Sequence, residues 1–339
     1  MQHQVKLRMR LLPSCGLLVL LTVAGCSSLA GQAGPVAGTP VVPSGLAGRL
    51  LYTRDGGLST LALQSSEARQ IVPAPELGQV TAARWSPDGT RVAYAIAEVR
   101  NRRIPVSEIR VAAADGSNTQ TVLSSEGALA FGTPTWAPDG AHLYLTRTGL
   151  DQGQRVRRIE RVDIASSASE VIFEDVAPFD VSSDGRWMAV ARAGNLGQSI
   201  LLVDLSSGQQ RTIVQEREFD TIAAPRFESS SNRLLFTAAA LTAGAPSDPL
   251  AERLALALLG AGRAFAHGLP QDVYAAPITG GAPSKVAAIS ADEPAVAPSP
   301  DGSQLAILTA DALATMPVGG GRLTTLLAPG GFGTVDWAP

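Results

Sequence analysis

Cysteine is almost absent from this sequence. Its 339 residues include two cysteines, Cys15 and Cys26. Cys15 lies in the N-terminal segment 1–25, which we expect to be removed from the mature protein. One cysteine then remains, at the start of the mature chain, and this excludes an internal disulfide and a cysteine nucleophile within the fold.

Histidine and the common catalytic motifs are also scarce. Beyond residue 25 the chain has His142 and His267 only. The sequence lacks a Gly-x-Ser-x-Gly nucleophile elbow and a His-Glu-x-x-His motif, and no phosphate-binding loop or dinucleotide fingerprint stands out. Two histidines and no thiol leave little for a transition-metal site. We therefore expect no metal, no cofactor and no catalytic residues.

Charge is limited in amount and mildly acidic in balance. Charged residues make up 17% of the chain and apolar residues 45%, so a sizeable core is expected. The whole chain has a net charge of −3, and without segment 1–25 it has 24 basic and 30 acidic residues. An acidic mature protein argues against nucleic-acid binding.

The N-terminus has the pattern of a secretion signal. Residues 1–10 contain three basic side chains, and the apolar stretch 11–25 is too short to span a bilayer. The sequence Leu-Thr-Val-Ala-Gly-Cys at 21–26 resembles the lipobox of bacterial lipoproteins. That resemblance implies a lipid on Cys26 and a chain anchored on the outer side of a membrane, in the periplasm or on the cell surface. The alternative is an ordinary cleaved signal followed by a chance cysteine. Residues 26–45 are expected to form a flexible tether.

A repeat dominates the rest of the chain. The clearest copy is Trp85-Ser-Pro-Asp-Gly89, followed by an apolar segment. Equivalent positions follow one another at intervals of 51, 45, 46, 71 and 39 residues. Units of 40–50 residues with several short strands each are typical of β-propellers. Proline, aspartate and glycine suit the tight turn that joins the first two strands of a unit. The residues assigned to these turns are Asp88, Gly89, Asp139, Gly140, Asp184, Gly185, Asp301 and Gly302.

The two ends of the repeat region are complementary. Residues 49–73 contain three strand-like segments but lack the first strand of a unit, and residues 334–338 supply such a strand. We therefore predict an all-β, six-bladed propeller over residues 46–339, with four-stranded antiparallel blades. One blade is shared by the N- and C-terminal strands, because ring closure removes exposed sheet edges.

These repeats resemble the WD40-like (PD40) repeats of TolB-type propellers. The resemblance covers about 290 residues and rests on the Trp-Ser-Pro-Asp-Gly motif. It implies the fold rather than the function, because propellers serve many chemistries.

One interval is longer than the others. It contains an insertion at about 239–270, in which Asp248, Pro249 and Gly260 are suitable start and stop residues for a leucine-rich helix. The leucine stripe could pack on the propeller itself, or it could contact a partner or a membrane. His267, also in the insertion, could face the central pore.

Arginines cluster on the same face as the insertion. Two segments, predicted to be loops between the second and third strands of blades two and three, carry Arg100, Arg102, Arg103, Arg155, Arg157 and Arg158. They could be solvated charges paired with Glu98, Glu108, Asp151 or Glu160. Together with His267, they could instead form an anion- or partner-binding rim. The tether enters on the opposite face, so this rim would point away from the membrane.

These observations favour a monomeric, lipid-anchored binding scaffold for another envelope protein, a peptide or a glycan. The alternative is a propeller hydrolase or lyase acting on a polysaccharide or peptide, and a purely structural or sensor domain is a third hypothesis. The central channel should discriminate: converging charges favour an enzyme and an apolar plug favours a scaffold.

Overall fold

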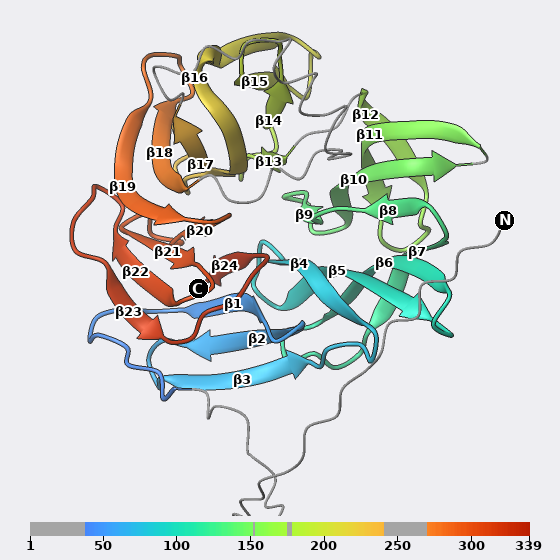
Figure 1. Ribbon diagram of the computed structural model, residues 1–339, viewed down its shortest axis with the longest axis horizontal. Helices are drawn as coiled ribbons and strands as arrows, with labels where there is room; N and C mark the ends of the chain where they lie inside the picture. The colour runs from blue at the N-terminus through green and yellow to red at the C-terminus, as the bar shows by residue number, and fades with distance from the viewer. Residues whose placement is uncertain (1–37, 152, 175–177, 241–269) are drawn as a thin grey trace, which may run out of the picture. The chain divides into compact units, whose positions relative to one another are not determined.

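Strands are the only regular elements in the part of the chain that the computed structural model describes, residues 38–151, 153–174, 178–240 and 270–339. They form five antiparallel sheets within a unit spanning residues 37–339. Figure 1 shows these sheets arranged around a common centre, with β24, β4, β9, β13 and β20 innermost. This arrangement is that of a β-propeller.

The first two sheets have four strands each. The first runs in the order β24 (Val335–Ala338), β1 (Arg49–Arg54), β2 (Gly57–Ala62), β3 (Glu67–Val72). The second runs β4 (Gly78–Trp85), β5 (Arg91–Arg100), β6 (Ile104–Ala113), β7 (Gln120–Glu126).

The third sheet has a divided innermost strand. Its order is β12 (Ser169–Glu174), β11 (Gln154–Asp163), β10 (His142–Asp151), β8 (Leu129–Phe131), and β9 (Thr135–Trp136) also pairs with β10. Pro134 lies between β8 and β9 and lacks the amide hydrogen that a continuous strand needs.

The remaining sheets have seven and four strands. The larger contains β13 (Phe179–Val181), β14 (Trp187–Ala193), β15 (Gln198–Asp204), β16 (Gln210–Phe227), β17 (Arg233–Ala240), β18 (Gln271–Pro277) and β19 (Ser284–Ala291) in sequence order. The smaller contains β20 (Ala295–Pro298), β21 (Gln304–Leu308), β22 (Leu313–Pro317) and β23 (Thr324–Leu327).

The seven-stranded sheet departs from the prediction of separate four-stranded blades. Strand β16 pairs with β15 through Gln210–Phe219 and with β17 through Phe219–Phe227. Its interior has no proline or glycine before Pro225, so the chain stays extended instead of turning between two blades. Register shifts around Phe219 and Ala223 let one strand serve both halves.

The terminal strands pair as the sequence predicts. Leu50 lies opposite Trp337 and Tyr52 opposite Val335 in the β1–β24 ladder. The Trp337 indole N–H donates to the Ala47 carbonyl at 3.0 Å, and its ring packs in a buried cluster with Leu50 and Leu308. The last strand is therefore held both by main-chain bonds and by an apolar side chain.

The chain joins this unit before the predicted end of the tether. The Val41 N–H donates to the Leu326 carbonyl at 2.8 Å, and Val42 and Leu46 pack against the cluster around Trp337. The tether was predicted to extend to residue 45. These contacts attach the chain from residue 41, because Val42 and Leu46 bury part of their apolar surface.

The second and third strands of the second and third sheets are longer than predicted. Strands β5, β6, β10 and β11 each have ten residues, whereas β14 has seven and β21 has five. The predicted loop at 155–158 lies inside β11, and Arg100 is the last residue of β5. Buried Val156 and Ile159 explain the difference, because apolar residues on this segment extend the ladder.

Arginine and tryptophan side chains link neighbouring sheets. The Arg49 guanidinium lies 4.7 Å from the centre of the Trp85 ring and donates to the Gly89 carbonyl at 2.7 Å. Arg91 repeats this contact one sheet further, over the Trp136 ring at 4.8 Å and on the Gly140 carbonyl. Arg49 and Arg91, each at the start of a second strand, thus fasten the next turn through its tryptophan and its glycine carbonyl.

The predicted helical insertion at 239–270 falls almost entirely outside the described residues. Strand β17 ends at Ala240 and β18 begins at Gln271.

Candidate functional site

The turn aspartates bind their own turns. The Asp88 carboxylate accepts hydrogen bonds from the Ser86 hydroxyl at 2.6 Å, the Thr90 N–H at 3.1 Å and the Thr90 hydroxyl at 2.9 Å. These bonds, the one from Ser86 foremost, lower the pKa of Asp88 to about 2. Gly89 takes a φ of 67°, a conformation that few other residues adopt readily. Asp139, Asp184 and Asp301 accept equivalent bonds. We name the end of the unit that carries these turns the turn face.

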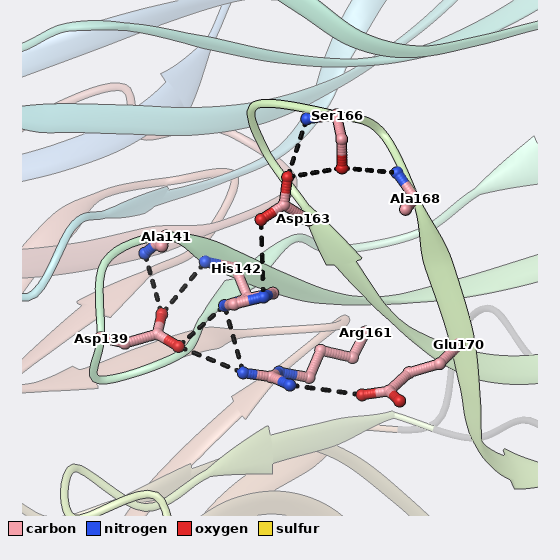
Figure 2. A network of polar contacts seen from close by, with 8 residues as sticks. All are labelled: Asp139, Ala141, His142, Arg161, Asp163, Ser166, Ala168 and Glu170. Carbon is pink, nitrogen blue, oxygen red and sulfur yellow. Dashed lines mark hydrogen bonds and ion pairs between the residues drawn. The ribbon is translucent and has the colours of Figure 1, made fainter.

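His142 takes the place of the linking arginine in the third sheet. Figure 2 shows its ring between Asp139 and Asp163, at 2.8 and 3.6 Å, with Arg161 bridging Asp139 and Glu170. The next repeat has valine at the tryptophan position, Val181, so an arginine here would have no ring to cover. The histidine instead joins two turns of its own sheet.

A buried glutamate organises the arginines of the second sheet. Glu108 on β6 accepts bonds from Arg100 and from Arg110, and Arg100 also donates to Glu98 at 2.6 Å. The Glu108 side chain is 5% exposed. Burial raises its pKa, but the charged hydrogen bonds from Arg100 and Arg110 outweigh burial, and the net pKa is lowered. Glu108 is therefore ionised at neutral pH.

The third sheet repeats this arrangement. Glu160 lies on β11, and its side chain is 1% exposed. It accepts hydrogen bonds from Arg147 Nε at 2.9 Å and from Arg158 Nε at 2.6 Å. Arg100 and Arg158, both predicted as candidate binding residues, are thus paired with glutamates. The remaining arginines of the predicted rim, Arg102, Arg103, Arg155 and Arg157, have exposed side chains.

Apolar side chains accompany these exposed arginines. We name the ends of the β5–β6 and β10–β11 hairpins the hairpin tips; they lie on the hairpin face, opposite the turn face. Val99, Ile104 and Leu150 on the tips, and Leu77 beside the first tip, are 38–52% exposed. A cavity of about 720 Å³ extends from this first tip to Phe131 on β8. Each tip therefore combines basic and aliphatic side chains at the end of a rigid hairpin.

Two predicted positions, Cys26 and His267, lie outside the described residues.

The sequence prediction missed a set of polar residues at the centre of the molecule. They occupy the position just before the repeat tryptophan, on the innermost strands. Five of the six equivalent positions are polar: Arg84, Thr135, Asp180, Arg226 and Asp336, with Ala297 as the sixth. The sequence allows this set to be predicted, because the residue that precedes a buried aromatic on a strand faces the opposite side.

These residues form a charged layer across the channel, which we name the waist. Arg226 forms a short hydrogen bond with Asp336, and Arg84 Nη1 lies 3.9 Å from the same carboxylate. Asp336 also accepts the Trp85 N–H at 2.8 Å, and Asp180 accepts the Phe227 N–H at 2.8 Å. An innermost strand has a sheet neighbour on one side only, so these carboxylates satisfy main-chain groups on its open side.

Burial changes the acidity of the waist. Desolvation raises the pKa of Asp180 to about 6, although the positive charge of Arg84 opposes the shift. Desolvation also raises the pKa of Asp336, again against Arg84.

A cavity adjoins the waist on each side. On the turn face, about 420 Å³ is lined by Arg84, Thr135, Asp180, Arg226 and Asp336 and by the prolines of the turns. On the hairpin face, about 440 Å³ is lined by Arg84, Phe179, Pro225, Val296 and Val335, among others. The channel thus opens into one cavity on each face, and the ion pairs of the waist separate the two cavities.

The described ranges lack a metal-binding cluster and a membrane-spanning helix. Those residues contain no group of three or more acidic, histidine or cysteine side chains arranged to hold a metal ion. None of their elements is a helix long and apolar enough to cross a membrane.

Comparison with known proteins identifies the fold. No protein-family model and no curated protein matches the sequence. Among solved structures, TolB from Acinetobacter baumannii superposes with a TM-score of 0.65 at 16% identity, over 88% of this chain and 68% of that one. A chain of a Nidogen/Laminin complex gives 0.60 at 13% identity, over 86% and 98%. Oligogalacturonate lyase from Vibrio parahaemolyticus gives 0.50 at 12% identity, over 82% and 73%. The chain has the fold of the TolB-type β-propeller.

Proposed function

We propose that this chain is a lipid-anchored β-propeller that binds a partner protein or peptide on the outer side of a membrane. The observation that carries the proposal is the pair of hairpin tips. They hold exposed aliphatic and arginine side chains on adjacent sheets, and exposed apolar surface beside charge is characteristic of interaction sites.

The buried glutamates support a binding role for these hairpins. Glu108 and Glu160 each pair with two arginines and hold them in place. Arg102, Arg103 and Arg155 then extend beyond these ion pairs. A partner with acidic and aliphatic side chains would complement such a surface.

Six blades and a closed ring are part of this proposal. The seven-stranded sheet divides naturally at Phe219 into two halves, in which β16 is the outermost strand of one blade and the innermost strand of the next. With the β1–β24 ladder, six wedges then surround the channel. Such a rigid ring would present the hairpin tips in a fixed geometry, which lowers the entropic cost of binding.

Photo-crosslinking in intact cells tests the proposal. We would place a crosslinking amino acid at Ile104 on the first tip and, as a matched control, at Ser207 on the turn face. We expect a discrete protein adduct from position 104 alone, lost in the variant Arg102→Glu, Arg103→Glu, Arg155→Glu. Equal yields from both positions, or adducts unaffected by charge reversal, would contradict the hairpin face as the binding surface.

Lipidation is tested separately. Cys26→Ser should prevent incorporation of a labelled fatty acid into the protein, while binding through the hairpin tips persists. Equal labelling of the variant and the parent chain would contradict the lipid anchor.

A second candidate function is that of a propeller lyase or hydrolase. One observation favours it: the channel holds two arginines and two carboxyl groups, and Asp180, with its pKa raised to about 6, has the acidity of a general base. The binding role is preferred because both carboxylates already accept main-chain bonds. Turnover of a polysaccharide or peptide that disappears in Asp180→Asn would establish the enzyme instead.

A further inference from the structure

The waist of the channel contains hydrogen-bond donors that the described residues leave without acceptors. Arg84 Nε and Arg226 Nη1 are buried, and neither has a hydrogen-bond partner among the described residues. The Thr135 hydroxyl is buried in the same way. The whole residues Arg84 and Arg226 are each 8% exposed. Leaving such buried groups without a partner is unfavourable.

Unpaired hydrogen-bond acceptors are fewer than unpaired donors in the turn-face cavity. Glu228 Oε1 is the one carboxylate oxygen among the unpaired buried atoms of the turn-face cavity in the described structure, and Arg233 Nη1 lies 3.5 Å from it. The two waist carboxylates already accept main-chain N–H groups. A ligand that pairs with the unpaired donors would therefore have to supply acceptor oxygens.

The charge around these donors selects among acceptors. Arg84 and Arg226 come from different sheets and converge on one carboxylate, Asp336. Planar guanidinium groups match the two oxygens of a carboxylate. Because Asp180 and Asp336 lie alongside, a dianion such as phosphate would be repelled more strongly than a monoanion.

The walls of the cavity indicate what carries the acceptor. The turn-face cavity holds about 420 Å³, which admits a short ligand or the end of a chain. Turn residues, chiefly prolines and serines, form its rim. The charged side chain among them, Glu228, has Arg233 Nη1 3.5 Å away, so the body of the ligand is expected to be uncharged.

We propose that the turn-face cavity binds a carboxylate on a short uncharged body, with Arg84 and Arg226 as the recognising groups and Thr135 as a further donor. The site is at the opposite end of the molecule from the hairpin tips. It therefore stands independently of the protein-binding role.

Titration calorimetry on the purified chain tests this site. The probes are acetyl-Ala-Ala with a free carboxylate, the same peptide as its amide, butyrate, and inorganic phosphate. We expect the free acid to bind at least tenfold more tightly than the amide and than phosphate. Butyrate binding as tightly as the peptide acid would identify a small free acid as the ligand class, whereas a preference for the peptide acid would identify a chain end.

Variants separate recognition from stability. Arg226→Gln should weaken binding of the peptide acid at least tenfold. Asp180→Asn keeps an acceptor for the Phe227 N–H but removes a negative charge, so it should tighten binding about threefold or more. Loss of structure cannot produce that gain, and this variant decides the question if Arg226→Gln fails to fold. Thr135→Val should weaken binding about threefold through its lost hydroxyl, and Arg102→Gln on the hairpin face is the unchanged control.

The proposal is overturned if acid and amide bind alike, if neither binds at millimolar concentration, if phosphate is preferred, or if Asp180→Asn weakens binding.

Discussion

Single side chains hold neighbouring sheets together, and Arg91 shows how much one of them contributes. Its guanidinium covers the Trp136 ring and donates to the Gly140 carbonyl. Arg91→Met keeps the aliphatic stem but removes both interactions, so we expect a loss of about 1–2 kcal/mol in the free energy of unfolding. Chemical denaturation measures it, with Arg322→Met, an exposed position, as the control. Equal stability of the two variants would contradict the linking role.

Asp180 makes stability depend on pH. Its pKa is about 6 in the folded state against an ordinary value of 3.8, so the folded state binds the proton more tightly. The free energy of unfolding should therefore rise as pH falls from 7 to 4, by about 2 kcal/mol from this group.

The variant Asp180→Asn isolates that contribution. At pH 7 the variant should have a larger free energy of unfolding than the parent chain, because it buries no charged carboxylate at this position. This advantage should shrink as pH falls from 7 to 4. The turn aspartates have the opposite effect on stability at lower pH. The pKa of Asp88 is lowered to about 2, so the free energy of unfolding falls as pH drops below about 4 and this carboxylate is protonated. A difference that stays constant between pH 4 and 7 would show that Asp180 does not titrate there.

At the scale of elements, the β5–β6 hairpin is separable from the rest of its sheet. Glu98 pairs directly with Val106, so residues 99–105 can be replaced by Asn-Gly without changing the register. Glu108 loses Arg100 but keeps Arg110, and we expect a loss of about 1–2 kcal/mol with the fold retained. Thermal unfolding followed by circular dichroism measures the change.

The same shortened hairpin should abolish crosslinking to the partner from the neighbouring tip. A matched deletion that does change register, removing residues 99–104, should unfold the sheet instead. Retained partner contact in the register-preserving variant would argue that this hairpin is a structural extension only.

At the scale of the whole molecule, the proposed ring closure depends on β24. Removing residues 335–339 deletes the ladder to β1, the buried Trp337 and the Asp336 contacts to two arginines and Trp85. A Trp→Ala change alone costs about 3–5 kcal/mol in a core, so this deletion should lower the melting temperature by well over 10 °C or prevent folding. Removing Pro339 alone is the control and should change little, since β24 ends at Ala338. Unchanged melting of the longer deletion would contradict closure through β24.

The amino-acid sequence by itself determined the strands next to each turn and the pairing of the two ends. Pro-Asp-Gly turns and alternating apolar residues are local signals, and the three strand-like segments predicted within residues 49–73 are β1, β2 and β3. Three features were decided by tertiary structure alone. Strand β16 joins two halves of a sheet because nothing in Gln210–Phe219 stops an extended chain, and the β10–β11 hairpin extends because buried Val156 continues the ladder. Arg84, Arg226, Asp180 and Asp336 meet at the waist because the arrangement of sheets around a common centre brings together residues up to 252 positions apart, from Arg84 to Asp336. Spacing along the chain predicts each of these side chains to face away from its own core, but their mutual contacts exist only once the sheets surround a common centre.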